Sequence, residues 1–292
     1  MNEDEVIVVD GIPDDAYRSI VEESLRYAIL SLAFTVNRMA LNSLKSRLIN
    51  IAKGKIAEKL FFFFARRNAI PLDTTPCRTP FYQVDRRDFI LNDLEWDIKN
   101  NFLFHSGDLL PDFYTHLPAL VPERNNRDQW AKRYEKQIPA SKGVAFLFTF
   151  MKLSDRRGNS FPRFFDLELS KAQLDLLHRA HSKYRGKAQT KAPFREEVFW
   201  KEWQKSNERK TIDFRINNFP ALIITAYATE NEFNQFQPLP EDRMFVNGAL
   251  HTRIRNRSVP VQELPSFASL FPHLRENLQV AHFRAFPPVS EM

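Results

Sequence analysis

Hydrophobic side chains recur at helical spacing through the first part of the chain. Apolar positions over residues 14–37 repeat every three or four residues, which predicts an amphipathic helix with Asp14 as its cap. A second helix is expected over about 40–68, with a break near residues 52–54. The end of this second helix is apolar nearly all round, so it should be buried.

The hydrophobic pattern changes to that of strands after residue 80. Phe81–Leu91 and Leu94–Phe104 flank Asn92-Asp93, a two-residue turn, so they predict a β-hairpin. Strands are also expected over 144–153, 163–169 and 219–228, helices over 126–137, 171–183 and 196–204, and a hairpin around Asn247-Gly248. Ser170 is the expected cap of the 171–183 helix. The order helix, strand, strand, helix, strand over about 40–155 is typical of a mixed α/β core.

The predicted hairpin brings charged residues onto one face. Counting outward from the turn places Asp88 opposite Asp97, and Lys99 lies two residues further on the same face. The other face is entirely apolar and consists of Phe89, Leu91, Leu94, Trp96 and Ile98. A slip of one residue would disrupt this pairing, so the apolar pattern supports the register.

Two facing carboxylates repel each other unless a cation lies between them. Oxygen ligands of this kind suit Mg²⁺ or Mn²⁺, which also bind phosphate oxygens and water. Such a metal polarises a phosphate and lowers the pKa of a bound water, and a nearby lysine can orient that water. Asp88, Asp97 and Lys99 therefore predict a site for phosphodiester hydrolysis.

The charge of the chain favours a polyanionic partner. The 292 residues carry a net charge of +6, but the first 16 contain six acids and no Lys or Arg, so the rest carries +12. A field of that sign attracts nucleic acid. The single cysteine, Cys77, excludes an internal disulfide or a cysteine zinc cage and fits a reducing cytosol. The apolar run at residues 28–36 is too short to span a bilayer, and the first residues are acidic, so we expect a cytoplasmic protein without a membrane partner.

The hairpin sequence is similar to a known nuclease signature. Asp88-Phe-Ile-Leu, a short turn and Glu-Trp-Asp97-Ile-Lys99 resemble the D…(D/E)xK motif of the PD-(D/E)XK nuclease superfamily, which has the restriction-endonuclease-like fold. Gly54-Lys-Ile-Ala-Glu58 looks like the helix that delivers a further acidic ligand in that fold. The resemblance covers about 50–155, and Val144–Leu153 follows where the next core strand is expected.

The motif departs from the family pattern at two positions. Arg87 stands where the family has a proline before the first aspartate, and Asp97 replaces the commoner glutamate. Neither departure removes a ligand, and Asp85 is an alternative to Asp88 as the first aspartate.

The resemblance implies a fold and a division of the chain. The fold would be α/β, with a restriction-endonuclease-like core in which helices flank a mixed central sheet. That core would occupy residues 50–183, with an N-terminal helical region at 1–49 and a C-terminal α+β extension at 184–292 that packs on the core and contacts DNA.

The resemblance also implies an activity. Asp88, Asp97 and Glu58 would bind Mg²⁺, for which Mn²⁺ can substitute, and Lys99 would help to activate the attacking water. The implied protein is a sequence-specific type II restriction endonuclease that leaves 5′-phosphate and 3′-hydroxyl ends. Such enzymes usually cut double-stranded DNA as homodimers.

Several polar side chains outside the site are candidate nucleic-acid contacts: Asn100, Asn101, Lys183, Arg185, Lys187, Lys191, Arg253, Arg255 and Arg257. The last three would form one basic row if their segment is a strand. Such a row could equally be a charged edge strand that discourages aggregation.

Other interpretations remain open. The charged hairpin face could be a solvated surface with an ion pair, and Glu58 could simply pair with Lys55 or Lys59. Glu95 is either a spare ligand or a structural partner. For the whole chain, the alternatives are a partner-dependent nuclease of the same superfamily, for repair, transposition or phage defence, and a nuclease-fold protein that only binds nucleic acid.

Overall fold

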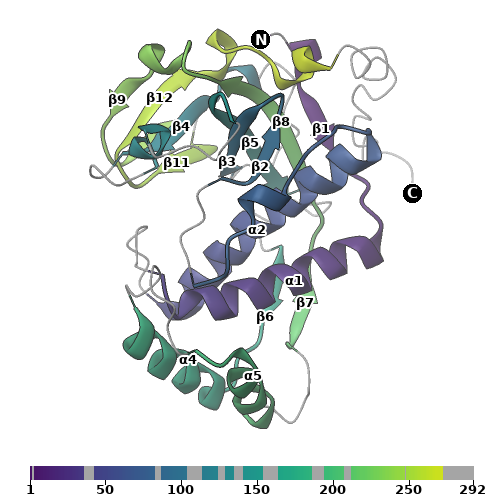
Figure 1. Cartoon of the computed structure of the whole chain (residues 1–292), viewed down its shortest axis with the longest axis vertical. Coiled ribbons are helices and arrows are strands. Elements are labelled where there is room, and N and C mark those ends of the chain that lie inside the picture. Colours follow the sequence, from purple (N-terminus) through teal and green to yellow (C-terminus); the bar gives the residue numbers. More distant parts are fainter. Residues whose placement is uncertain are drawn as a thin grey trace.

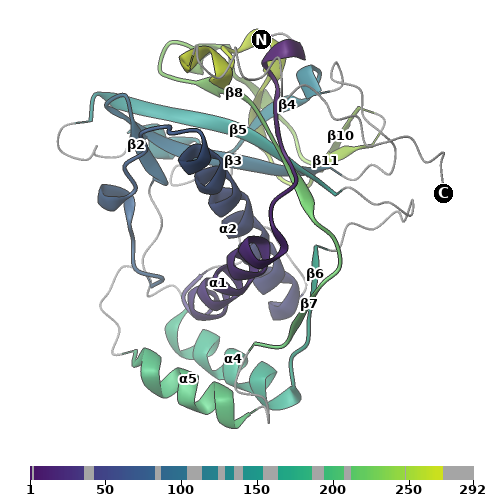
Figure 2. The same cartoon turned by 90° about the vertical axis from the view of Figure 1, so that its right-hand side faces the viewer.

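A computed structural model gives the arrangement of the chain (Figures 1 and 2). It describes residues 1, 3–35, 43–82, 87–103, 114–123, 129–134, 141–153, 164–185, 194–206, 212–246 and 248–271. Asp85, Lys187, Lys191 and Asn247 were named in the predictions and lie outside the described residues.

A five-stranded mixed sheet forms the centre of the protein. Its strands lie in the order β1 (Ile7–Val9), β8 (Pro220–Ala228), β5 (Gly143–Leu153), β3 (Leu94–Leu103) and β2 (Phe89–Leu91). β3 and β5 are parallel, and the other neighbours are antiparallel. The mixed α/β class is therefore confirmed, and the sheet joins strands from the N-terminal, central and C-terminal parts of the chain.

One long helix, α2 (Leu44–Arg67), packs on one face of this sheet, and a second, α1 (Asp14–Leu32), packs against α2 on the same side (Figure 2). The N-cap of α1 is Pro13, so Asp14 is its first residue and not its cap. α2 is continuous, and the expected break near residues 52–54 is absent, because the buried face of α2 packs on α1, α4 and the sheet. Phe61 of α2 stacks on Phe89 of β2, with ring centroids 5.2 Å apart.

Smaller β elements cover the opposite face of the sheet. β4 (Pro118–Pro122), β12 (Asn256–Pro260) and β9 (Gln237–Leu239) form a three-stranded sheet, beside the hairpin of β10 (Arg243–Phe245) and β11 (Leu250–Thr252). Alternate residues of β5 supply the two cores. Phe146, Phe148 and Phe150 point toward these β elements, whereas Ala145, Leu147 and Met151 point toward the helices.

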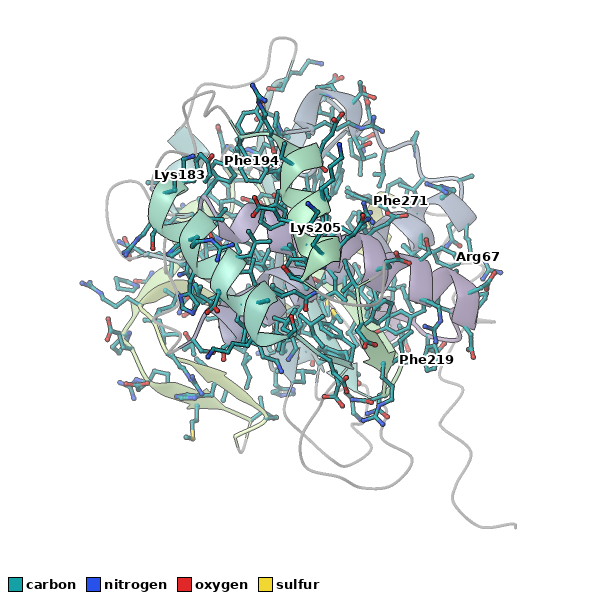
Figure 3. The ribbon with its side chains drawn as sticks, turned by 90° about the horizontal axis from the view of Figure 1, so that it is seen from below. Arg67, Lys183, Phe194, Lys205, Phe219 and Phe271 are labelled. Atoms are coloured by element: carbon teal, nitrogen blue, oxygen red, sulfur yellow. The ribbon has the colours of Figure 1, made fainter. Side chains whose placement is uncertain are left out.

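The remaining elements lie at the end of the molecule farthest from the small β elements (Figure 1). They are α4 (Lys171–Tyr184), α5 (Glu196–Lys205) and the two-stranded ribbon of β6 (Phe165–Leu167) and β7 (Phe214–Ile216). Ser170 is the N-cap of α4, as predicted, and it forms a capping box with Gln173. Figure 3 views this end, with Lys183 near the end of α4 and Lys205 at the end of α5.

The observed elements differ from the prediction in two further places. Among the described residues, the strand expected from Phe81 is present only as β2, and the helix expected over 126–137 only as a 3₁₀ turn at Ala131–Tyr134. None of the described helices is long and apolar enough to span a membrane.

Candidate active site

The hairpin of β2 and β3 has the predicted register. Asn92 and Asp93 both adopt positive φ angles, 51° and 61°, which produce the type I′ geometry of a two-residue turn. Leu91 lies opposite Leu94, and Phe89 lies opposite Trp96. The Phe89 and Trp96 rings are stacked, with centroids 5.7 Å apart and planes 9° from parallel. The aromatic pair therefore supports this register, as the hydrophobic pattern indicated.

Asp88 lies just beyond the regular ladder, which ends at Phe89. Its backbone N–H donates to the Trp96 carbonyl oxygen at 2.8 Å, and its carboxylate accepts from the backbone N–H of Ile98 at 2.6 Å. The prediction that Asp88 pairs directly with Asp97 in the ladder was therefore wrong in detail. The regular pairing ends at Phe89 and Trp96, one residue before Asp88 and Asp97 would pair. Asp88 is nevertheless bound to the residue that separates Asp97 from Lys99.

Asp97 and Lys99 form a buried ion pair on β3. Lys99 Nζ donates to Asp97 Oδ2 at 2.6 Å. Lys99 is only 4% exposed and Asp97 only 8%. The same amine donates to Gln129 Oε1 at 3.2 Å and lies 4.8 Å from the centroid of the Phe146 ring. The ammonium group is therefore held by a carboxylate, an amide and an aromatic face. A solvated strand face, which was the alternative for these residues, does not describe them.

Glu58 approaches the same region from α2. Its carboxylate bonds to Lys55 Nζ at 2.6 Å, which is the pairing considered from the sequence. Burial, followed by the negative charges of Glu58 and Asp97, raises the pKa of Asp88 to about 8, although Lys55 and the hydrogen bond from Ile98 act in the opposite direction. The structure thus brings Glu58, Asp88 and Asp97 into one electrostatic neighbourhood.

Glu95 has a structural role in the described residues. Arg87 Nε lies 3.3 Å from Glu95 Oε2, and both side chains are buried. Ser141 Oγ donates to Glu95 Oε1 at 2.5 Å. Arg87 therefore neutralises an acid beside the site, which favours the structural partner over the spare ligand as the role of Glu95.

Two residues near the site were missed by the sequence analysis. Gln129 lies 30 positions after Lys99, in a segment without any motif, so nothing in the sequence indicated its contact. Arg87 was noted only as a departure, although its charge is opposite to that of Glu95 across the hairpin.

The side chains near Asp88 have the chemistry of a hard-cation site, although they do not form a preassembled one. Among the described residues, no group of three or more His, Cys, Asp or Glu side chains lies close enough to hold a metal ion. The carboxylates of Asp97 and Glu58 are each bonded to a lysine. The donors are oxygens, and a divalent cation would offset both causes that raise the pKa of Asp88, its burial and the negative charges of Glu58 and Asp97. The donor set therefore fits Mg²⁺, given rotation of two carboxylates away from their lysines.

The carboxylates of the candidate site also affect the thiol of Cys77. Burial and the carboxylates of Asp88 and Glu95 raise the pKa of its thiol to about 12. The thiol is protonated at neutral pH, so it is not a nucleophile or a soft metal ligand under these conditions.

The predicted nucleic-acid contacts are spread over the surface. Arg253 and Arg255 are exposed between β11 and β12, whereas Arg257 lies in β12 and bonds to Glu123 at 2.9 Å. The single basic strand was therefore wrong. The physical reason is Asn256, whose side-chain amide donates to Thr252 Oγ1 and to the Ile254 carbonyl oxygen and so folds the segment into a turn.

The other predicted contacts differ in exposure. Asn100 accepts from Thr149 Oγ1 at 3.0 Å within the central sheet, and Asn101 next to it is partly buried. Lys183 and Arg185 are exposed at the end of α4 (Figure 3 labels Lys183). They lie on the helical end of the molecule, away from the small β elements that carry the arginines.

Comparison of the chain with models of protein families, with curated proteins and with solved structures finds no match in any of the three. The function must therefore be inferred from the site itself.

Proposed function

We propose that this protein is a Mg²⁺-dependent nuclease that hydrolyses phosphodiester bonds in DNA at Asp88, Asp97 and Lys99, with Glu58 as a further ligand. The observation that carries the proposal is the bond from the Ile98 N–H to Asp88, which holds this carboxylate beside the buried Asp97–Lys99 pair. The raised pKa of Asp88 adds a physical reason for a cation at this position.

Each residue has a distinct role in this proposal. Asp88, Asp97 and Glu58 would hold Mg²⁺, which when bound polarises a phosphate and lowers the pKa of a water. Lys99 orients the attacking water and stabilises the negative charge that develops on the phosphate. Because its amine is buried, its charge acts in a medium of lower dielectric constant than water and is therefore more effective. Gln129 and Phe146 keep the amine in place.

The proposal extends to a type II restriction endonuclease with a restriction-endonuclease-like core, which acts as a cytoplasmic homodimer on double-stranded DNA. Its support is the signature Asp88…Asp97-Ile-Lys99 and the net charge of +12 over residues 17–292. The exposed Arg253 and Arg255 add basic side chains for the DNA backbone.

A nuclease-fold protein that binds nucleic acid without cutting it is the second candidate. The lysine partners of Asp97 and Glu58 favour it, because a lysine that neutralises a carboxylate competes with a metal ion. A nuclease that needs a partner protein would also be inactive alone.

Cleavage of plasmid and phage DNA by the purified chain in Mg²⁺ tests the proposal. The informative variant is Lys99→Met, which removes the amine but retains most of the side-chain volume. Lys142→Met is the matched control, since Lys142 pairs with Asp93 on the same hairpin at 2.7 Å but is exposed to solvent.

We expect discrete, Mg²⁺-dependent fragments from the wild type and from Lys142→Met, with cleavage by Lys99→Met at least about 100-fold slower. Equal cleavage by Lys99→Met would show that the site is wrong. If no protein cuts in Mg²⁺ or Mn²⁺, the isolated chain is not a nuclease, and the binding-only and partner-dependent functions take precedence.

A further inference from the structure

A surface pocket between α1 and α2 adjoins the candidate active site. Its volume is about 340 Å³, and it is lined by Glu23, Arg26, Tyr27, Lys55, Glu58 and Lys59. Glu58 belongs to both the pocket and the proposed metal site, and the charges of Lys55 and Glu58 both act on Asp88. The pocket therefore shares Glu58 with the proposed metal site, and its size is within the range of small-ligand sites.

The acidic side chains of the pocket are already neutralised. Lys59 Nζ donates to Glu23 Oε2 at 2.5 Å, and Lys55 Nζ donates to Glu58 Oε2 at 2.6 Å. Lys55 Nζ also lies 4.8 Å from the centroid of the Tyr27 ring, which it partly covers. Arg26 is the third cation of the lining, so the pocket has an excess of positive charge.

Arg26 is held by an aromatic ring instead of an acid. Its guanidinium carbon lies 4.8 Å from the centroid of the Trp200 ring on α5, and no carboxylate pairs with it in the described part of the chain. Trp200 is itself fixed, because its Nε1 donates to Glu196 Oε1 at 3.1 Å. An arginine stacked in this way keeps its in-plane N–H groups available, and these groups match the two oxygens of a phosphate.

We propose that this pocket binds a phosphate of the DNA backbone that neighbours the phosphate under attack. Arg26 is the anchor for this phosphate, and Trp200 supports Arg26. The inference rests on the proposed nuclease function and adds a substrate-binding subsite on α1, to which the sequence analysis assigned no function. Lys55 and Lys59 supply additional positive charge around that phosphate.

Arg18 provides a matched control on the same helix. It is also an exposed arginine of α1, and its guanidinium carbon lies 5.8 Å from the centroid of the Phe214 ring. It precedes Arg26 by about two helical turns and does not line the pocket. A substitution of Arg18 therefore removes the same charge and the same kind of ring contact outside the proposed subsite.

Binding of a fluorescein-labelled DNA duplex in EDTA, followed by fluorescence anisotropy over a salt series, tests the inference without cleavage. We expect Arg26→Gln to weaken binding about tenfold and to reduce the slope of log affinity against log salt by about 0.9. Arg18→Gln should leave both quantities within twofold of the wild type. Arg26→Lys should fall between Arg26→Gln and the wild type, because it retains the charge but loses the planar fork.

Two outcomes would overturn the inference. Equal affinities for Arg26→Gln and Arg18→Gln would mean that the pocket has no special part in DNA binding. Binding of inorganic phosphate in the pocket, together with an unchanged DNA affinity of Arg26→Gln, would mean that the pocket is a site for a free anion. These results are separable from the nuclease proposal, since DNA binding through Arg26 with no cleavage would retain the subsite and remove only the enzyme.

Discussion

The carboxylate of Asp88 accepts a hydrogen bond from the backbone N–H of Ile98 at a distance of 2.6 Å. This bond joins the residue before β2 to the middle of the Asp97-Ile98-Lys99 segment, where the regular ladder has already ended. Asp88 is therefore positioned by its side chain together with the bond from its backbone N–H to the Trp96 carbonyl oxygen. Its carboxylate is held in a partly buried place beside two other acids, which accounts for the direction of its pKa shift.

The raised pKa of Asp88 predicts a specific dependence of stability on pH. The folded protein retains the Asp88 proton up to about pH 8, whereas the unfolded chain releases it near the ordinary value of 3.8. The folded state binds more protons between these values, so the contribution of Asp88 to stability falls as the pH rises through this range and is constant above it. Asp88→Asn should remove this contribution.

Urea unfolding of the wild type and of Asp88→Asn, at several pH values across that range, measures the effect. The free energy of unfolding of the variant minus that of the wild type should increase toward high pH. A difference that stays constant with pH would show that Asp88 ionises in the folded protein near its ordinary pKa.

Mg²⁺ should stabilise the folded protein above about pH 8, where Asp88 is charged. A ligand that binds only the folded state adds about 2.7 kcal/mol at a concentration 100 times its Kd, so the Tm should rise with Mg²⁺ concentration. Differential scanning fluorimetry of the wild type and Asp88→Asn provides the measurement. Asp242→Asn is the control, because Asp242 is an exposed acid that lies beside His251 and is distant from Asp88 in the sequence. An equal response of Asp88→Asn and the wild type would place the cation elsewhere.

Breaking the Asp97–Lys99 pair on one side should destabilise the fold strongly. Both residues are buried, so removing one leaves an uncompensated charge, at a cost of about 3–5 kcal/mol. Asp97→Leu and Lys99→Met should therefore each be less stable than the wild type by about that amount. The double variant should lose much less than the sum, which a double-mutant cycle from urea unfolding measures. Additive losses would mean that the two charges do not depend on each other.

Phe89 supports the hairpin from the helix side, and its truncation should be costly. Its ring lies between Phe61 of α2 and Trp96 of β3, and it is fully buried. Phe89→Ala should lower the free energy of unfolding by about 3–5 kcal/mol. Met244→Ala, which truncates a side chain that is 70% exposed, should change it by less than about 0.5 kcal/mol. Similar losses for both variants would contradict the role of the stacked rings.

The sequence predicts local features of the site better than contacts between distant segments. Periodic apolar positions were sufficient to predict the helices α1, α2 and α4 and the register of β2 and β3. Each of these features depends on residues that are close in the sequence. β4 was not predicted, since its short segment is bounded by Pro118 and Pro122 and is a strand only through pairing with β12.

The departures at the site have the same origin. Counting in steps of two assumes a regular ladder, so it could not reveal that the backbone becomes irregular at Asp88. Gln129 reaches Lys99 only because the chain folds back over the sheet, and the arginine-rich segment turns because of the side chain of Asn256. These contacts depend on tertiary structure, which a single sequence does not display.

The pairing of β1 with β8 has a consequence for how this protein is made. Ile7 lies opposite Ile224, so the two strands are separated by about two hundred residues of chain. Closing so long a loop is slow, and it requires the later strand to have left the ribosome. α2 and the hairpin are synthesised much earlier, yet β5 lacks its second neighbour until β8 arrives. A nascent chain that ends before residue 220 therefore carries Asp88, Asp97 and Lys99 on an incomplete sheet.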